Sequence, residues 1–362
     1  MMRDLPMASD PEKICIWAIT PGGIVLGERL QAHFPGSDFM VSSGAMMGKT
    51  LPGGASNFKK LATALGEQFS HYDAHICIFS TGIAVRLLAP LLCSKLEDPA
   101  VVVMDDKGFH AISLISGHLG GANELAHRVA KASGATPVIT TATDVNSLPS
   151  IDMIAKECGL VIDNPPSIKT VNMAFLRKEP IFLIDPLPCL IKALPEKFRA
   201  GQGQDGGQNG IKRVSIQCSD VLLSVPRKTL LLRPKSLVAG MGCNRGTSQS
   251  ELMALLTRSF ERLGLSLKSL AAFATTEVKA DEPGLLDLAR SLGVPISFYD
   301  KDALNSVETI QNPSKTVEKF LGVKSVCEAA AILASHSGKL VVPKIKKGNA
   351  TLAVARIDPD YL

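Results

Sequence analysis

The chain has 362 residues, 46% hydrophobic and 20% charged, which is enough apolar material for two or three packed domains. The formal net charge is only +5 and 5% of the residues are aromatic, so the composition argues against nucleic-acid binding. No apolar run approaches the ~18 residues of a membrane span, so no membrane association is expected. The eight cysteines are scattered without a Cys-x-x-Cys pair, which argues against a zinc cluster or a disulfide framework and predicts a cytoplasmic location.

Short apolar runs alternate with helical patterns over residues 12–145. The runs predict strands at 14–19, 75–79, 100–104, 109–115 and 137–141. A polar Asp-Asp-Lys-Gly segment between the third and fourth runs is typical of a hairpin turn. Strands that alternate with helices predict a mostly parallel sheet with helices on both faces, which is a doubly wound α/β domain.

Two further regions follow. Residues 146–232 are rich in proline and include a flexible Gly/Gln-rich loop at 201–210, and they predict a smaller middle domain. The alternation of strands and helices restarts over 235–358, with a short strand at 237–239 and a glycine turn at 240–246. The expected fold class is therefore α/β, with two doubly wound, mostly parallel-sheet α/β domains that flank a smaller middle α/β region.

A glycine-rich turn with one histidine follows the run at 109–115. It reads Ser116-Gly117-His118-Leu119-Gly120-Gly121, and a helical pattern begins near Ala122. Glycines let the backbone approach a ligand closely, and the first amides of a helix can bind an anion. An imidazole can transfer protons near neutral pH. The turn therefore indicates a catalytic or binding site, and the alternative is a tight turn in which His118 only caps or packs.

The glycine turn at 240–246 superficially resembles a dinucleotide-binding fingerprint. Its third glycine is one position late, and no clear acid follows at the end of the next strand, so the motif does not support a nicotinamide or flavin cofactor. Gly242 and Arg245 indicate a carboxylate site instead, because a guanidinium beside free backbone amides suits a carboxylate.

Polar side chains also gather after two predicted strands, in the groups Thr141, Thr143 and Asp144, and Glu277, Lys279 and Glu282. The first group can hydrogen-bond a polar ligand or cap a helix. The second group suits general acid–base chemistry, and the alternative is a solvated loop at the start of a helix.

Taken in order, these motifs resemble the cobalt-precorrin-5A hydrolase family of anaerobic cobalamin biosynthesis. In the N-terminal half the segments that carry the resemblance lie at 80–86, 95–103, 116–123 and 139–144. In the C-terminal half they lie at 240–246, 277–285, 322–330, 344 and 351–355. The similarity extends from about Ile14 to Ile357, and the Gly/Gln-rich stretch at 201–210 departs from it.

The resemblance implies a reaction on a cobalt-corrinoid tetrapyrrole. Water opens the δ-lactone of cobalt-precorrin-5A, and a two-carbon unit leaves as acetaldehyde to give cobalt-precorrin-5B. Cobalt arrives within the substrate, so no cofactor is expected, and the cysteines and histidines lack the spacing of a resident metal site. Neighbouring enzymes of the pathway are the expected partners, and a homodimer is left open.

For this chemistry we predict catalytic roles for His118, Glu277 and Lys279, with His118 as the first choice for the general acid or base. The residues predicted to bind the substrate are Arg86, Lys95, Ser116, Gly117, Gly120, Gly121, Asn123, Thr141, Thr143, Asp144, Gly242, Arg245 and Glu282. Two alternatives remain open: a corrin-pathway methyltransferase, and a non-catalytic protein that shelters a labile tetrapyrrole.

Overall fold

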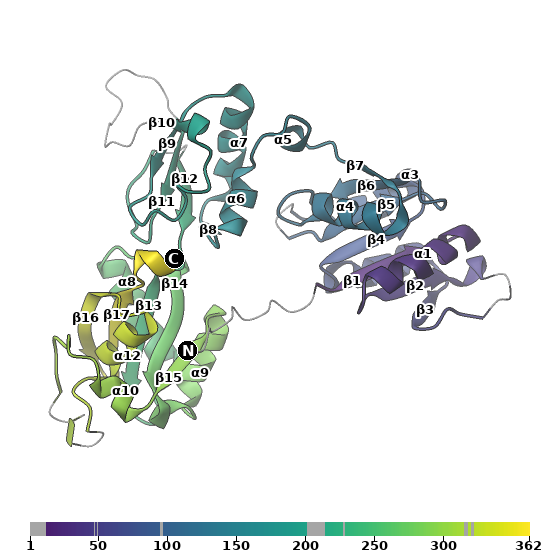
Figure 1. The fold of residues 1–362 in the computed structure, drawn as a ribbon. Helices are drawn as coiled ribbons and strands as arrows, with labels where there is room; N and C mark the ends of the chain where they lie inside the picture. The colour runs from purple at the N-terminus through teal and green to yellow at the C-terminus, as the bar shows by residue number, and fades with distance from the viewer. Residues whose placement is uncertain are drawn as a thin grey trace. The chain divides into compact units, whose positions relative to one another are not determined.

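The computed structural model describes residues 12–46, 48, 50–94, 97–200, 214–226, 229–314, 318–319 and 322–362. They form two compact units, which divide after Met153 (Figure 1). Two sequence predictions, Lys95 and the loop at 201–210, lie outside the described residues. None of the described helices combines the length and the hydropathy that crossing a membrane requires.

The first unit contains a seven-stranded sheet with the order β3-β2-β1-β4-β5-β6-β7. Its strands are β1 (Ile14–Ala18), β2 (Asp38–Ser42), β3 (Ala55–Phe58), β4 (Ala74–Ile78), β5 (Ala100–Met104), β6 (His110–Ile115) and β7 (Thr136–Val138). The pairs from β3 through β5 are parallel, β6 is antiparallel to β5, and β7 is parallel to β6. The predicted hairpin between β5 and β6 is therefore confirmed.

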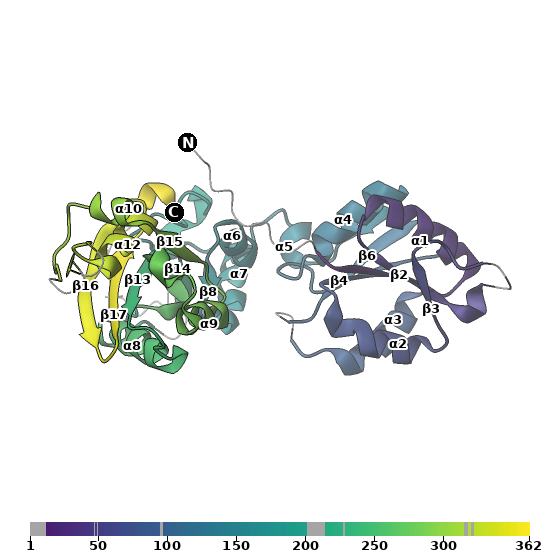
Figure 2. The same ribbon diagram turned by 90° about the horizontal axis from the view of Figure 1, so that it is seen from below.

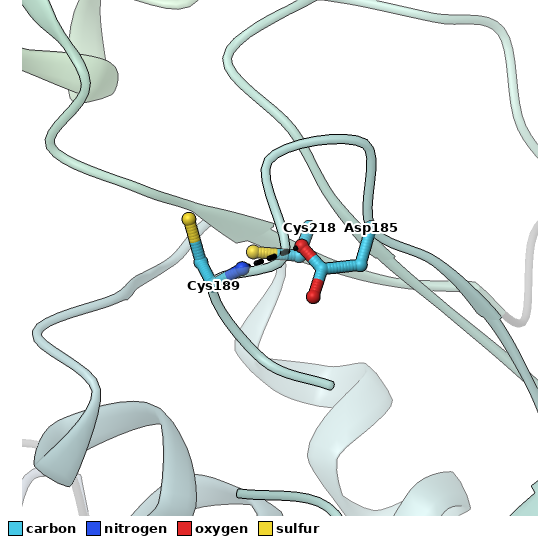
Figure 3. A group of neighbouring side chains, drawn as sticks. All are labelled: Asp185, Cys189 and Cys218. Atoms are coloured by element: carbon cyan, nitrogen blue, oxygen red, sulfur yellow. Dashed lines mark hydrogen bonds between the residues drawn. The ribbon is translucent and has the colours of Figure 1, made fainter. Parts of the chain in front are cut away.

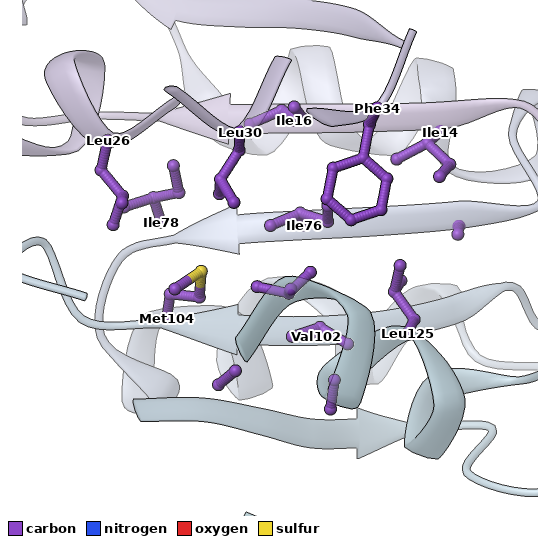
Figure 4. Close-up of a cluster of buried hydrophobic side chains, with 14 of the residues drawn as sticks. Ile14, Ile16, Leu26, Leu30, Phe34, Ile76, Ile78, Val102, Met104 and Leu125 are labelled. Atoms are coloured by element: carbon purple, nitrogen blue, oxygen red, sulfur yellow. The ribbon is translucent and has the colours of Figure 1, made fainter. Parts of the chain in front are cut away.

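Helices cover both faces of this sheet, as predicted for a doubly wound fold. The helices are α1 (Pro21–His33), α2 (Leu61–Gln68), α3 (Thr81–Leu88) and α4 (Ala122–Ser133). Figure 2 shows α1 and α4 on one face and α2 and α3 on the other. Leu30 of α1 and Leu125 of α4 belong to one buried cluster with Ile76 of β4 (Figure 4). Burial of these apolar side chains, at about 25 cal/mol per Å², holds the helices on the sheet.

The reversal at β6 decides which loops share an edge of the sheet. Ile115, at the carboxyl end of β6, pairs with Val101 at the start of β5. The turn after β6 therefore lies at the edge where β4 and β5 begin. The turns after β1 and β4 lie at the opposite edge, because those strands run the other way.

The second unit begins with the smaller middle sheet, whose order is β10-β9-β11-β12-β8. Its strands are β8 (Val161–Ile162), β9 (Ile181–Ile184), β10 (Arg199–Ala200), β11 (Ser215–Cys218) and β12 (Thr229–Arg233). Two helices accompany it, α6 (Ile151–Glu157) and α7 (Ile168–Arg177). The β12–β8 pair is antiparallel and the other three are parallel.

The C-terminal sheet has the order β15-β14-β13-β17-β16. Its strands are β13 (Leu237–Cys243), β14 (Leu270–Thr276), β15 (Ile296–Tyr299), β16 (Lys339–Lys347) and β17 (Ala350–Arg356). The β13–β14 and β14–β15 pairs are parallel, whereas β17 is antiparallel to both β13 and β16. This sheet is therefore mixed, since its last two strands form a hairpin.

Helices again cover both faces of the C-terminal sheet. Buried leucines of α8 (Gln249–Arg262) and α9 (Pro283–Leu292) pack against one face. Side chains of α10 (Lys301–Asn305) and α12 (Val326–Ala334) pack against the other. The doubly wound arrangement expected for this region is present in these two helical layers.

The predicted glycine turn at 240–246 requires a correction. Strand β13 continues through Cys243, and Gly240 and Gly242 pair with Ala353 and Thr351 of β17. A Cβ on Gly240 would lie 1.9 Å from the carbonyl oxygen of Cys327, so the glycine lets α12 pack directly on the strand. A glycine inside a strand is typical of such a close approach of two backbones. The prediction of a turn at Gly240 and Gly242 is therefore wrong.

Candidate active site

The turn that carries His118 is folded tightly around two glycines. A Cβ on Gly120 would lie 2.3 Å from the Cβ of Ser116, and a Cβ on Gly117 would lie 2.8 Å from Oδ1 of Asn123. Ser116 itself has φ of +57°, a left-handed conformation that is uncommon for a residue with a side chain. Its hydroxyl donates to the carbonyl of Asp98 at 2.8 Å, which ties the turn to the segment before β5.

The start of α4 is capped by this turn. The N–H of Ala122 donates to the carbonyl of Ser116 at 3.1 Å, and the N–H of Asn123 donates to the carbonyl of Gly117 at 3.0 Å. Gly121 precedes the helix with φ of +87°, which bends the chain so that these carbonyls reach the helix amides. The expectation that these amides receive an anion is therefore corrected, because the loop already satisfies them.

The imidazole of His118 lies between two carboxylates. Its Nε2 is 2.9 Å from Oδ2 of Asp144 and 3.0 Å from the hydroxyl of Thr143. Its Nδ1 is 3.4 Å from the hydroxyl of Ser150 and 3.6 Å from Oδ2 of Asp152, in the first turn of α6. The side chain of His118 is 21% exposed, so the ring is fixed but reachable by solvent.

Asp144 is the centre of a hydrogen-bond network that fixes this ring. Its Oδ2 accepts the hydroxyl of Thr141 at 2.6 Å and the amide of Asn123 at 3.2 Å, besides its contact with His118. Burial raises the pKa of Asp144, but the hydrogen bonds from Thr141 and His118 outweigh it and hold the pKa below its ordinary value. Asn123 also accepts the hydroxyl of Ser113 at 2.7 Å, which joins the network to β6.

The structure thus brings together five of the predicted site residues around one imidazole, namely His118, Asn123, Thr141, Thr143 and Asp144. Arg86 does not join them. It belongs to α3, and its Nη1 donates to the carbonyl of Gly82, in the first turn after β4. This places Arg86 at the opposite edge of the sheet from His118, because β4 and β6 run in opposite directions.

Four charged residues predicted in the C-terminal domain lie after β14 or β13. Nζ of Lys279 donates to Oε2 of Glu282 at 3.0 Å, and the N–H of Gly246 donates to Oε1 of Glu282 at 2.7 Å. Burial raises the pKa of Glu282, whereas the hydrogen bonds from Lys279 and Gly246 lower it to below its ordinary value. Arg245 is 58% exposed and bonded to Asp281, and Glu277 is exposed.

Glu282 is only 1% exposed, and the two donors occupy both of its oxygens. This position suits a group that holds Lys279 and the loop of Arg245, rather than one that touches a substrate. The guanidinium of Arg245, which was expected to bind a carboxylate of the substrate, donates to the carboxylate of Asp281 and the carbonyl of Val278 within the protein.

A pocket of about 230 Å³ opens at the carboxyl end of β13. Gly242 and Lys279 line it, together with Lys344 and Lys346 of β16, for which the sequence motifs predicted no site role. Neither Lys344 nor Lys346 forms an ion pair with any residue in the described part of the chain. The ammonium groups of these two lysines therefore have no carboxylate of the described residues within ion-pair distance. The sequence feature that could have indicated this site is Pro343. Proline disrupts regular strand pairing, so the side chain of the following residue, Lys344, can leave the regular strand arrangement.

Among the residues that the structure describes, one group with metal-ligating atoms lies in the middle region, in β11 and the turn after β9 (Figure 3). Asp185, Cys189 and Cys218 present side-chain atoms within 4.8 Å of one another. The carboxylate of Asp185 already accepts backbone N–H groups of Cys189, Leu190 and Ile191, so it builds the turn after β9. A hydrogen bond with Cys189 and burial both raise the pKa of Cys218, whereas the same hydrogen bond lowers the pKa of Cys189. Only one of the two sulfurs therefore favours the thiolate that a metal requires.

Three family models match the chain in consecutive segments. "Cobalamin synthesis G N-terminal" matches residues 63–144, "Cobalamin biosynthesis central region" matches 149–234, and "Cobalamin synthesis G C-terminus" matches 237–355. The first segment contains His118 and Asp144, the second contains Ser150 and Asp152, which contact the same imidazole, and the third contains the pocket lined by Lys344 and Lys346. The fold and these segments define a three-region protein of cobalamin synthesis.

Two relatives extend over nearly the whole chain. A cobalt-precorrin-5A hydrolase of Priestia megaterium is 36% identical, with 95% of this chain and 94% of that protein covered. The enzyme of the same name from Salmonella typhimurium is 35% identical, with 95% and 97% covered. The crystal structure of a putative cobalamin biosynthesis protein G homolog from Sulfolobus solfataricus is 24% identical, covers 95% of this chain and 97% of its own, and superposes with a TM-score of 0.34. The chain belongs to the cobalt-precorrin-5A hydrolase family, and the resemblance inferred from its motifs is confirmed.

Proposed function

We propose that this protein opens the δ-lactone of cobalt-precorrin-5A with water and releases acetaldehyde, to give cobalt-precorrin-5B. Its family membership supports the substrate. The observation that carries the chemistry is the imidazole of His118, fixed between Asp144 and Asp152 and still partly exposed. Lactone opening requires a positioned group that can take a proton from water, and a histidine held by a carboxylate suits that task.

In the first step, His118 takes a proton from the attacking water. Because Nε2 faces the carboxylate of Asp144, the tautomer with its hydrogen on Nε2 donates there and leaves the lone pair on Nδ1. The contacts of Nδ1 with Ser150 and Asp152, at 3.4 and 3.6 Å, are longer than a strong hydrogen bond, so an entering water can replace them. Water adds to the lactone carbonyl, and the ring C–O bond breaks to give a carboxylate and a hydroxyl.

His118 returns its proton to the ring oxygen as the C–O bond breaks. In the second step it takes the proton of the new hydroxyl, whose oxygen then forms the carbonyl of acetaldehyde. The C–C bond to the macrocycle breaks, and its electron pair enters the macrocycle and its cobalt. No oxidant or reductant is needed, and the electron sink belongs to the substrate. We therefore propose that the enzyme requires no nicotinamide, flavin, S-adenosylmethionine or metal of its own. Retention of stoichiometric metal by the substrate-free protein, with loss of activity on chelation, would contradict this.

The remaining site residues are assigned supporting roles. Asp144, Asn123, Thr141 and Thr143 orient the imidazole, and Ser116, Gly117, Gly120 and Gly121 shape the loop that carries it. Lys279 and Glu277 are proposed as the acid–base pair of the C-terminal domain, with Glu282 as the group that holds Lys279. Arg86, Lys95 and Arg245 are proposed to bind substrate carboxylates, and Gly242 to leave room in the pocket at the carboxyl end of β13. The cytoplasmic location, partner enzymes and homodimer stay predictions.

The test is to incubate the purified protein with cobalt-precorrin-5A and to trap acetaldehyde during turnover. A catalytic protein releases one acetaldehyde for each substrate consumed. A protein that only shelters a tetrapyrrole binds the substrate and releases none. Transfer of a labelled methyl group from S-adenosylmethionine would instead support the methyltransferase alternative.

A further inference from the structure

The pocket at the carboxyl end of β13, lined by Lys344 and Lys346 and here called the lysine pocket, has one wall whose backbone is hydrogen-bonded to a buried carboxylate. Strand β16 is irregular beside the pocket: Val342 pairs with Val354 and Ile345 with Leu352, so two residues face one on β17. This β-bulge contains Pro343 and Lys344. A bulge redirects the side chains next to it and leaves a backbone N–H without a strand partner.

The carboxylate of Glu328 accepts a hydrogen bond from that N–H. Its Oε1 accepts the backbone N–H of Lys344 at 2.9 Å, and it lies in the first turn of α12, which packs on β13. Pro343 has no N–H, so the hydrogen bond to Lys344 is the contact that fixes the bulge to the helix. The bulge and Glu328 together place Lys344 on the wall of the pocket.

The same carboxylate also accepts hydrogen bonds from a second segment of the chain, which leads to another lining residue of the pocket. Oε2 of Glu328 accepts the N–H groups of Gln311 at 2.8 Å and Asn312 at 2.9 Å, and Oε1 accepts the side-chain amide of Asn312 at 3.0 Å. Ser314, two residues further on, lines the pocket. Glu328 thus joins α12, the loop of Asn312 and the bulge of β16, all of which contribute to the lining.

Glu328 is completely buried and has no lysine or arginine among its described ion-pair partners. Burial raises its pKa, but the four hydrogen bonds lower it to below the ordinary value, so the carboxylate stays ionised. A buried charge is costly unless its oxygens are satisfied, and here the donors are amides of the pocket walls. The arrangement is therefore sensitive to the loss of charge at this one position.

We propose that the lysine pocket binds a carboxylate side chain of the substrate through Lys344, with Lys346 beside it, and that Glu328 is the positioning residue for Lys344. The ligand class follows from these two lysine side chains, which pair with no carboxylate of the described residues, together with the hydroxyl groups of Thr276 and Ser314, which also line the pocket. The inference rests on the proposed function, since the reaction supplies the ligand. Its pocket of about 230 Å³ has room for a side chain and not for the macrocycle.

The experiment measures acetaldehyde release for wild type, Lys344→Met, Glu328→Gln and the double variant. Loss of a charge-assisted contact should raise KM about tenfold or more for Lys344→Met, with a smaller change in kcat. Raised ionic strength should increase KM of the wild type more than that of Lys344→Met, because salt screens the lysine. Lys347→Met, on the same strand and exposed, and Glu308→Gln, also exposed, are the matched controls and should behave as wild type.

The double variant separates positioning from general destabilisation. If Glu328 acts through Lys344, adding Glu328→Gln to Lys344→Met should change KM little, whereas independent effects would multiply. Multiplied effects would overturn the positioning role, and an unchanged KM and salt dependence in Lys344→Met would overturn the pocket assignment. If Glu328→Gln does not fold, Glu328→Asp, which keeps the charge and shortens the reach, supplies the same comparison. No acetaldehyde from wild type would mean that the proposed function itself has failed.

Discussion

Two glycine-rich segments, 116–121 and 240–246, have the same local pattern of an apolar run, glycines and a helix, and they form different structures. In the first, the glycines compress a turn that carries His118. In the second, Gly240 and Gly242 stay in β13, and the turn follows only after Cys243. The difference arises from pairing: β17 runs beside β13 through Cys243, whereas β6 pairs with β5 only as far as Ile115. A glycine pattern therefore does not reveal a turn until its strand partners are known.

The sharpest test of the comparison is His118→Ala. If the first segment is a catalytic loop, kcat for acetaldehyde release should fall by about 10²–10⁴, because general acid–base catalysis contributes that much. The melting temperature should also fall, because the ring contacts Asp144 and Thr143, so kcat is compared at a temperature at which both proteins are folded. His127→Ala, at an exposed position of α4, is the matched control. Turnover near that of wild type in His118→Ala would remove His118 from the mechanism.

A substitution in the second segment should lower the stability of the fold and not the rate of the chemical step. Gly240→Ala places a Cβ 1.9 Å from a backbone carbonyl of α12, so either the helix or the strand must move. We expect a loss of about 1–3 kcal/mol or more in the free energy of unfolding, as for other overpacked cores. Urea unfolding followed by circular dichroism measures it. Gly53→Ala, where nothing lies within 4 Å of the added Cβ, should be nearly neutral. Equal stability of the two variants would contradict the packing role of Gly240.

The dependence of thermal stability on pH should show that the ionised carboxylate of Asp144 stabilises the first unit. Its folded-state pKa lies below the ordinary value of 3.8, so its stabilising contribution is present above that value and is lost as the pH falls through the lowered one. Asp144→Asn should therefore melt at a lower temperature than wild type near neutral pH, and the difference should shrink below about pH 4. Thermal melts across this range, with Asp106→Asn as an exposed control, provide the measurement. A difference that stays constant with pH would exclude the carboxylate charge as its cause.

Arg245 should give the smallest effect. Its guanidinium is 58% exposed and already shared with Asp281, and exposed ion pairs contribute little. Arg245→Ala should raise KM by roughly two- to fivefold and leave kcat close to that of wild type. Steady-state kinetics of Arg245→Ala would measure this change in KM. Arg262→Ala, at the end of α8, is the control and should behave as wild type. A large fall in kcat would instead place Arg245 near the reacting atoms.

Several features were predictable because short segments encode them. Helices α1 and α9 begin at Pro21 and Pro283, where proline fits the first helical position. The hairpin between β5 and β6 follows from its polar turn. The glycine pattern predicts the turn that carries His118, and strand ends predict site roles for Thr141, Thr143 and Asp144. The local patterns do not predict that Thr143 and Asp144 contact the His118 ring, or that Asn123 joins Thr141 beside it.

Other features depend on contacts between distant residues, and local patterns do not contain them. Arg86 and His118 belong to one predicted site, yet the reversal at β6 puts them at opposite edges of the sheet. Glu328 and Lys344 lie in segments that carry the family resemblance, and those segments predict no contact between them. Their hydrogen bond exists because a bulge releases an N–H at the place where a helix presents a carboxylate.

Local patterns were sufficient to predict the α/β class, the family and the turn that carries His118, because periodicity, capping residues and motifs act over a few neighbouring positions. Which side chains meet became clear only from the folded chain. The tertiary structure assigned Gly240 to helix packing, Glu282 to holding Lys279, and Lys344 to a pocket wall. The physical reason is that strand direction, register and bulges are settled by pairing between segments far apart in the chain, and a one-residue change in pairing redirects a side chain to the other face.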